Sequence, residues 1–185
     1  MSAQKNYGMC LSFLYLGTLK GRKQMKNKKT LFITQSAMIA ALYVAATYAA
    51  NLLGLASGAV QLRISEALTV LPAFTFAAVP GLFIGCAAAN LLTGCALWDV
   101  VFGSAATLIA ALGTYKFGKT APRAAFFPIA ANTVVVPFVL RYVYGAEGSL
   151  PYFFLTVFAG ELISCGVFGG ILYKAAKKSR IFDNR

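Results

Sequence analysis

The sequence contains no histidine, so it lacks the side chain that most often acts as general base or metal ligand near neutral pH. Its cysteines show no C-x-x-C spacing, and three of the four lie in apolar segments, where cysteine behaves as a small hydrophobic residue. These features argue against a metal centre and a disulfide framework. We therefore predict no metal, no cofactor and no catalytic residues.

Acidic residues are scarce as well. Five Asp and Glu stand against 17 Lys and Arg, which gives a formal net charge of +12. The cations lie almost entirely between apolar runs, a distribution that indicates membrane topology, so no nucleic-acid partner is predicted. Only 12% of the residues are charged and 59% are apolar, whereas soluble domains carry roughly 25% charged residues.

Apolar runs follow one another along the chain, and a membrane-spanning helix needs roughly 20 apolar residues. The sequence predicts an all-α integral membrane protein, a six-transmembrane-helix bundle that forms one domain over residues 25–185. Residues 1–24 do not continue the pattern, and we interpret them as a non-native or disordered extension before a natural start at Met25. The spans are expected at 31–53, 62–76, 81–92, 99–115, 124–144 and 150–173. Pro72 is expected to kink the second span or end its regular part, and Pro128 and Pro137 to interrupt the fifth.

The cations also predict orientation. Fifteen of the 17 Lys and Arg lie before the first span, in the loop 116–123 or after the last span. A six-span count places these three segments on one side, which the positive-inside rule makes the cytoplasmic side. Both termini are therefore predicted to be cytoplasmic, in a multi-pass protein of a bacterial plasma membrane.

An arginine and a glutamate lie where the second apolar span begins. In a helix, positions i and i+3 share a face, so Arg63 and Glu66 are expected to pair. Ionisable residues at membrane depth are costly and usually mark a substrate path. A purely structural ion pair at the mouth of a helix is the alternative.

Three acids from three spans are expected in the outer half of the membrane. Glu66 lies about one turn inside its span and Asp99 is a plausible N-cap of the fourth span. Glu161 lies roughly 18 Å below the outer end of the sixth span. We predict a polar pocket open to the outside, with Glu66 and Glu161 as ligand partners, Asp99 as third candidate, Arg63 tuning Glu66, and further contributions from Asn90, Asn132, Trp98 and Tyr142. Helix caps and ties between helices are the alternative interpretation. The excess of carboxylates favours a cationic ligand or one rich in N–H donors.

Small residues form a strip on the first span. Ala37, Ala41, Ala45 and Ala49 follow strict i+4 spacing, and such strips let another helix approach closely. The strip is predicted to dock a partner membrane protein, with packing inside the bundle as the alternative.

One segment matches the sequence pattern of a nucleotide-binding loop but lacks the structural setting that such a loop needs. Residues 113–120 (GTYKFGKT) fit the pattern G-x-x-x-x-G-K-[ST], but that loop functions between a strand and a helix. Here it follows a predicted membrane helix, so no nucleotide binding is expected.

Several motifs resemble a known family. Residues 60–72 (VQLRISEALTVLP), 79–86 (VPGLFIGC) and 99–104 (DVVFGS), together with 132–144 and 160–165, are similar to the queuosine-precursor transporter (QueT) family. These proteins are substrate-binding S components of energy-coupling factor (ECF) transporters. The resemblance covers about residues 28–176.

The resemblance implies six helices, an outward-facing site for one small molecule, and no ATPase activity in this chain. A membrane T component and two cytoplasmic ATPases would supply the energy. The implied ligand is a deazaguanine that bears an aminomethyl group. Competing hypotheses are an S component for another vitamin-like molecule, a structural or assembly membrane protein, and an intramembrane enzyme that uses the carboxylates as acid and base.

Overall fold

The computed structural model describes residues 28–54 and 62–179. The predicted extension at residues 1–24 lies outside the described residues. The helix α2 (Lys28–Leu52) begins in a separate unit that ends at Thr34, and the residues from Gln35 onward form one compact unit.

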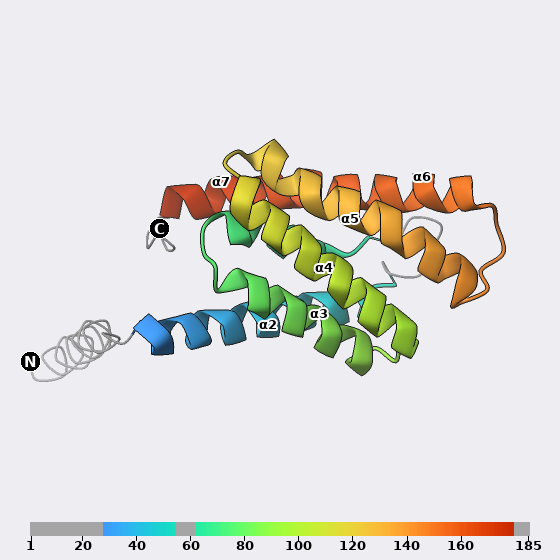
Figure 1. Cartoon of the computed structure of the whole chain (residues 1–185), viewed down its shortest axis with the longest axis horizontal. Coiled ribbons are helices and arrows are strands. Elements are labelled where there is room, and N and C mark those ends of the chain that lie inside the picture. Colours follow the sequence, from blue (N-terminus) through green and yellow to red (C-terminus); the bar gives the residue numbers. More distant parts are fainter. Residues whose placement is uncertain (1–27, 55–61, 180–185) are drawn as a thin grey trace, which may run out of the picture. The chain divides into compact units, whose positions relative to one another are not determined.

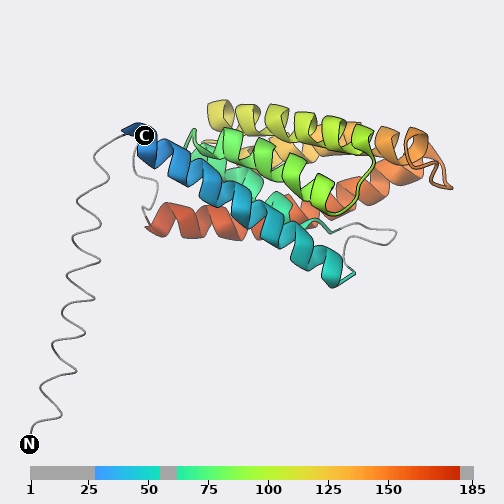
Figure 2. The same ribbon diagram turned by 90° about the horizontal axis from the view of Figure 1, so that it is seen from below.

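Every element of regular structure among the described residues is a helix. After α2 come η1 (Ile64–Ala73), α3 (Ala78–Leu92), α4 (Leu97–Phe117) and α5 (Ala121–Tyr142). The last elements, α6 (Leu150–Glu161), η2 (Leu162–Phe168) and α7 (Gly169–Ser179), form one continuous rod (Figures 1 and 2). The predicted all-helical class is confirmed.

Four helices are long and apolar enough to cross a membrane by length and composition: Lys28–Leu52, Leu97–Phe117, Ala121–Tyr142 and Leu150–Ser179. The second and third predicted spans correspond to shorter apolar helices, Ile64–Ala73 and Ala78–Leu92. Four of the six predicted spans therefore meet the length criterion, and the remaining two are helical but short.

The element η1 departs from the predicted α-helix. It is a 3₁₀-helix with Pro72 inside it, and eight of its ten residues are buried. In an α-helix the ring of Pro72 would clash with the carbonyl four residues earlier and leave it without a donor. The i→i+3 geometry avoids that clash, and at about 2.0 Å per residue it makes η1 roughly 20 Å long.

The fifth predicted span is continuous where an interruption was expected. Pro128 and Pro137 both lie inside α5, which runs unbroken over 22 residues. Pro128 and Pro137 are buried in the packed bundle, where neighbouring groups compensate for the backbone bonds that proline removes. Figure 1 shows α5 lying along α4.

Two glycines bring α3 against α2. A Cβ atom at Gly85 would lie 2.9 Å from the Cβ of Tyr43 and 3.0 Å from the Cα of Ala40. At Gly81 it would lie 2.7 Å from the backbone oxygen of Ser36. Because no side chain fits between them, the two helices are in backbone contact, as small residues permit in membrane bundles.

This contact predicts a large difference between two glycine substitutions. Gly85→Ala should lower the stability by about 1–3 kcal/mol, the usual cost of overpacking a well-packed site. Gly170→Ala is the matched control, because no atom lies within 4 Å of a Cβ there and alanine is the better helix former. Thermal unfolding of both variants in the same detergent measures the difference, and equal melting temperatures would contradict the close contact.

The alanine strip of α2 lies on the opposite side from the packed face. Ala37, Ala41, Ala45 and Ala49 are all exposed. Ile39, Tyr43 and Ala50 are buried instead and supply the contacts of α2 with the bundle. The strip therefore does not serve as packing within this chain, and its role toward a partner stays a prediction.

Candidate functional site

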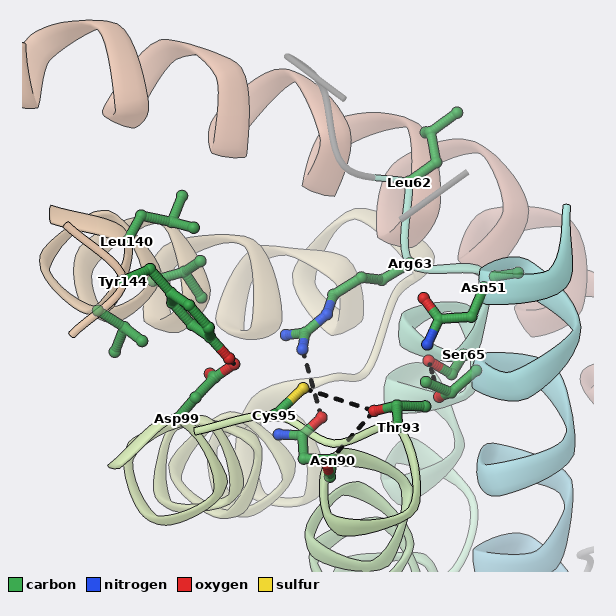
Figure 3. A pocket seen from close by; sticks show the side chains of 14 residues that line it. Asn51, Leu62, Arg63, Ser65, Asn90, Thr93, Cys95, Asp99, Leu140 and Tyr144 are labelled. Carbon is green, nitrogen blue, oxygen red and sulfur yellow. Dashed lines mark hydrogen bonds between the residues drawn. The ribbon is translucent and has the colours of Figure 1, made fainter. Parts of the chain in front are cut away.

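A polar pocket opens between the ends of α2, α3, α4 and α5 and the segment that leads into η1 (Figure 3). Its cavity volume is about 250 Å³, just below the roughly 300–1,000 Å³ usual for small-molecule sites. The lining residues are Thr47, Ala50, Asn51, Leu62, Arg63, Ser65, Asn90, Thr93, Cys95, Asp99, Val136, Val139, Leu140 and Tyr144.

Arg63 reaches across this pocket rather than along its own helix. It is the N-cap residue of η1, outside the helical segment, and its Nη2 donates to Oδ1 of Asn90 at 3.4 Å (Figure 3). Gly103 of α4 leaves room for the Asn90 amide, since a Cβ there would lie 3.1 Å from Nδ2. Because Arg63 lies outside the helical segment and its guanidinium contacts Asn90, the expected arrangement of Arg63 and Glu66 at positions i and i+3 of one helix is not seen, and the tuning of Glu66 by Arg63 stays a prediction.

Asp99 supplies the negative charge of the pocket wall. It lies in the first turn of α4, whose N-cap is Ala96, so its predicted capping role is wrong. Its carboxylate is buried and accepts a hydrogen bond from the hydroxyl of Tyr144 at 2.8 Å (Figure 3). The backbone N–H of Ala96 donates to the same hydroxyl at 3.1 Å. Partial burial and the neighbouring Asp99 carboxylate raise the pKa of Tyr144. The tyrosine therefore stays protonated at neutral pH and orients Asp99.

The other two predicted acids meet one helical turn deeper. Glu66 and Glu161 lie with Cys165 so that their ligating atoms are all within 4.8 Å of one another. Tyr43 donates to Oε1 of Glu66 at 2.5 Å, and Asn132 donates to Oε1 of Glu161 at 3.0 Å. Tyr43 and Asn132 each precede a pocket-lining residue by four positions, so this deep carboxyl cluster lies beneath the pocket.

One oxygen of this deep carboxyl cluster has no partner among the described residues. Glu66 is fully buried, and its Oε2 makes no hydrogen bond. Oε2 of Glu161 accepts a hydrogen bond from the Cys165 thiol at 3.2 Å. A buried carboxyl oxygen without a hydrogen-bond partner is costly, so Oε2 of Glu66 is available to a hydrogen-bond donor.

The same residues are the described group best placed to hold a cation. Glu66, Glu161 and Cys165 offer three ligating atoms, one fewer than the four protein ligands of a closed structural zinc site. The thiol is already hydrogen-bonded to a carboxylate and to the backbone oxygen of Glu66. We therefore assign no metal there and regard the cluster as a set of hydrogen-bonding acids.

The two predicted aromatic residues lie outside the pocket lining. Trp98 is 60% exposed and stacks on Phe102, and Tyr142 is 73% exposed and stacks on Phe138. Their predicted contribution to the polar pocket gains no support from this placement. Arg63, Asn90 and Asp99 do line the pocket, and Glu66, Asn132 and Glu161 are gathered below it.

Several lining residues escaped the sequence reasoning. Tyr144 was placed at the end of a span, and Thr93 and Cys95 in a short connection. Thr47 and Asn51 lie one and two turns after Tyr43 on the face of α2 that points away from the alanine strip. The position of these polar residues on α2 was the signal that could have revealed them. If the alanine strip faces a partner, polar residues on the opposite face of the helix must turn toward the bundle.

The fold and the pocket together define a class, a helical membrane protein built around a polar pocket. The family model described as QueT transporter matches residues 33–178. The chain belongs to the QueT transporter family, which is a family of transporters rather than enzymes.

One relative is a queuosine precursor transporter QueT of Lactococcus lactis subsp. cremoris (strain MG1363), 35% identical over 97 residues. The match covers 51% of this chain and 56% of the relative, so the chain spans little more than half the length of that protein. No solved structure matches the chain.

Proposed function

We propose that this chain is the substrate-binding S component of an ECF uptake transporter, and that it captures a deazaguanine-type queuosine precursor from outside a bacterial cell. The observation that carries the proposal is the pocket lined by Asp99, Asn90 and Arg63 in a member of the QueT family. The name of the relative, a queuosine precursor transporter, supports the choice of ligand.

The chemistry of the pocket fits such a ligand. A deazaguanine with an aminomethyl group has a planar ring, an N–H-rich edge and an ammonium group. Asp99 offers a carboxylate to N–H donors, Asn90 offers an amide that both donates and accepts, and Arg63 offers donors to a ring carbonyl. The deep carboxyl cluster adds negative potential beneath the cavity, which favours a cationic ligand over a neutral one.

The proposed topology keeps the six membrane spans that the sequence predicts. Four helices are long and apolar enough to cross the membrane on their own, and in the proposed arrangement the shorter η1 and α3, joined by a four-residue connection, complete the bundle from within. The cation distribution supports an orientation with both termini in the cytoplasm and the pocket on the outer side. The energy for uptake comes from a membrane T component and two ATPases, to which this chain docks through the exposed strip Ala37, Ala41 and Ala45.

A cysteine in the pocket lining allows ligand binding to be followed by chemical labelling. Cys95 is half-buried in the pocket lining, whereas Cys86 and Cys165 are fully buried. In a Cys10→Ser background, a membrane-impermeant maleimide should modify Cys95 from outside intact cells, and saturating aminomethyl-deazaguanine should slow the reaction at least tenfold. Mass spectrometry of the labelled protein gives the rate, and a Cys95→Ser variant shows the background.

Two outcomes of this experiment would contradict the proposal. Labelling that requires cell lysis would overturn the orientation. Labelling that the deazaguanine leaves unchanged, but that another nucleobase or vitamin-like molecule slows, would identify an S component for a different ligand. If purified protein shows no thermal shift with any such molecule, a structural or assembly role replaces transport.

A further inference from the structure

A second hollow lies at the opposite end of α5 from the polar pocket. Where α4 ends and α5 begins, three phenylalanines and two cations line a groove of about 490 Å³. Phe127 stacks on Phe117 with centroids 5.7 Å apart and meets Phe126 edge to face at 5.6 Å. Lys119 and Arg123 complete the lining, and both are exposed. We call this the aromatic–basic groove.

Positive charge dominates the surroundings of the groove. The ammonium of Lys116 lies 5.3 Å from the ring centroid of Phe117. The hydroxyl of Tyr173 on α7 donates to the backbone oxygen of Lys119 at 2.9 Å, so the helix that carries Lys174, Lys177 and Lys178 packs beside this turn.

No acid in the described part of the chain lies near enough to neutralise these cations. Glu66, Asp99 and Glu161 are buried in or below the polar pocket. Glu147 is in the loop at the far end of α5. Among the described residues, the groove therefore combines a net positive charge with an apolar aromatic surface, and a bilayer supplies one molecule with both complementary parts.

We propose that the aromatic–basic groove binds an anionic phospholipid. Its phosphate lies between Lys119 and Arg123, and an acyl chain lies against Phe126 and Phe127. Basic pockets between membrane helices on the cytoplasmic side are suited to anionic headgroups, and the topology proposed above puts this end of the bundle at the inner leaflet.

The start of α5 supports the placement of the phosphate. Thr120, its N-cap residue, makes no side-chain capping bond, and proline follows in the first turn. The backbone N–H groups of Ala121 and Arg123 are thus left to an anion beside the two cationic side chains. A nucleotide phosphate is not the occupant, because residues 113–117 of the G-x-x-x-x-G-K-T motif are wound into α4 and cannot form the phosphate-cradling loop.

The test compares two lipids with identical acyl chains on the purified full chain. Native mass spectrometry should show phosphatidylglycerol bound at least tenfold more tightly than phosphatidylcholine. The double variant Lys119→Gln/Arg123→Gln should remove that preference. The matched control Lys177→Gln/Lys178→Gln loses the same charge from exposed positions outside the groove, and it should retain the preference.

A third variant separates the apolar part of the groove. Phe126 is 62% exposed, so Phe126→Ala should fold normally and should weaken binding of both lipids about equally. Three results would overturn the proposal: equal binding of the two lipids by the parent, an equal loss in the control variant, or displacement of phosphatidylglycerol by millimolar inorganic phosphate. A fourth result would also overturn the proposal: if Lys119→Gln/Arg123→Gln lost co-purifying ATPases but kept the lipid preference, the groove would be assigned to a protein partner.

Discussion

Asp99→Asn should weaken binding of an aminomethyl-deazaguanine about 100-fold, with little change in the melting temperature of the unliganded protein. The amide keeps an oxygen that can accept the hydrogen bond from Tyr144, so the local structure is preserved. It loses the charge and places an N–H₂ group opposite the donors of the ligand. Charge-assisted hydrogen bonds contribute about 1.5–3 kcal/mol each, and a 100-fold loss corresponds to about 2.7 kcal/mol.

The other acids form a graded series around this variant. Glu161→Gln and Glu66→Gln should each weaken binding strongly if the deep carboxyl cluster supplies negative potential or contacts the ligand. Glu147→Gln, an exposed loop position outside the pocket, should change the affinity by less than threefold. Isothermal titration of the four variants measures the series. If the variants of Asp99, Glu66 and Glu161 all bind within about threefold of the parent, the acids are structural and the ligand site is elsewhere.

Ala41→Leu should abolish uptake of the ligand by cells while leaving its binding to the purified chain intact. Ala41 is exposed and lies in the middle of the alanine strip, where a leucine would hold a docked helix at a distance. Under the proposed function, uptake requires the energising partners, whereas binding requires only the pocket on the other side of α2. Ala45→Leu should behave in the same way.

A neighbouring position supplies the control for the docking experiment. Leu42 is 50% exposed and is the next residue after Ala41, outside the strip. Leu42→Phe adds bulk to the same helix and should leave uptake near the parental rate. Co-purification of the T component with each variant gives a second measurement. If Ala41→Leu loses ligand binding but still retains the T component, the strip supports the pocket and not the partner.

The helices were predictable wherever length and apolar character decide the structure. The boundaries of α2, α4 and α5 lie within three residues of the predicted spans. The 3₁₀ geometry of η1 was not predictable in this way, because it depends on how Pro72 is packed among buried neighbours. The same limitation applies to α5, where proline alone suggested interruptions but tertiary packing keeps the helix continuous.

The site was predictable in its residue types and less so in its geometry. A carboxylate in an apolar chain must find a polar partner, so Glu66, Asp99 and Glu161 stood out in the sequence. Their separation into a pocket wall and a deep cluster depends on helix rotation, which weakly amphipathic membrane helices do not reveal. Arg63 shows the difficulty, because its partner Asn90 is 27 positions away in the sequence.

The seven-residue π-helix η2 has a consequence for the register of the last rod. An i→i+5 turn holds more residues than an α-helical turn, so η2 delays the rotation of everything that follows it. Deleting one residue from Leu162–Phe168 would let the rod rewind as an α-helix, and the lost residue's rotation of about 100° would offset the rotation that the wider turns had delayed. Glu161 and Tyr173 would then keep nearly the same relative orientation, and Tyr173 would keep its bond to the α4–α5 turn. The π-helix thus accommodates one extra residue between the acid below the pocket and the basic end of the chain while preserving the angular phase between them.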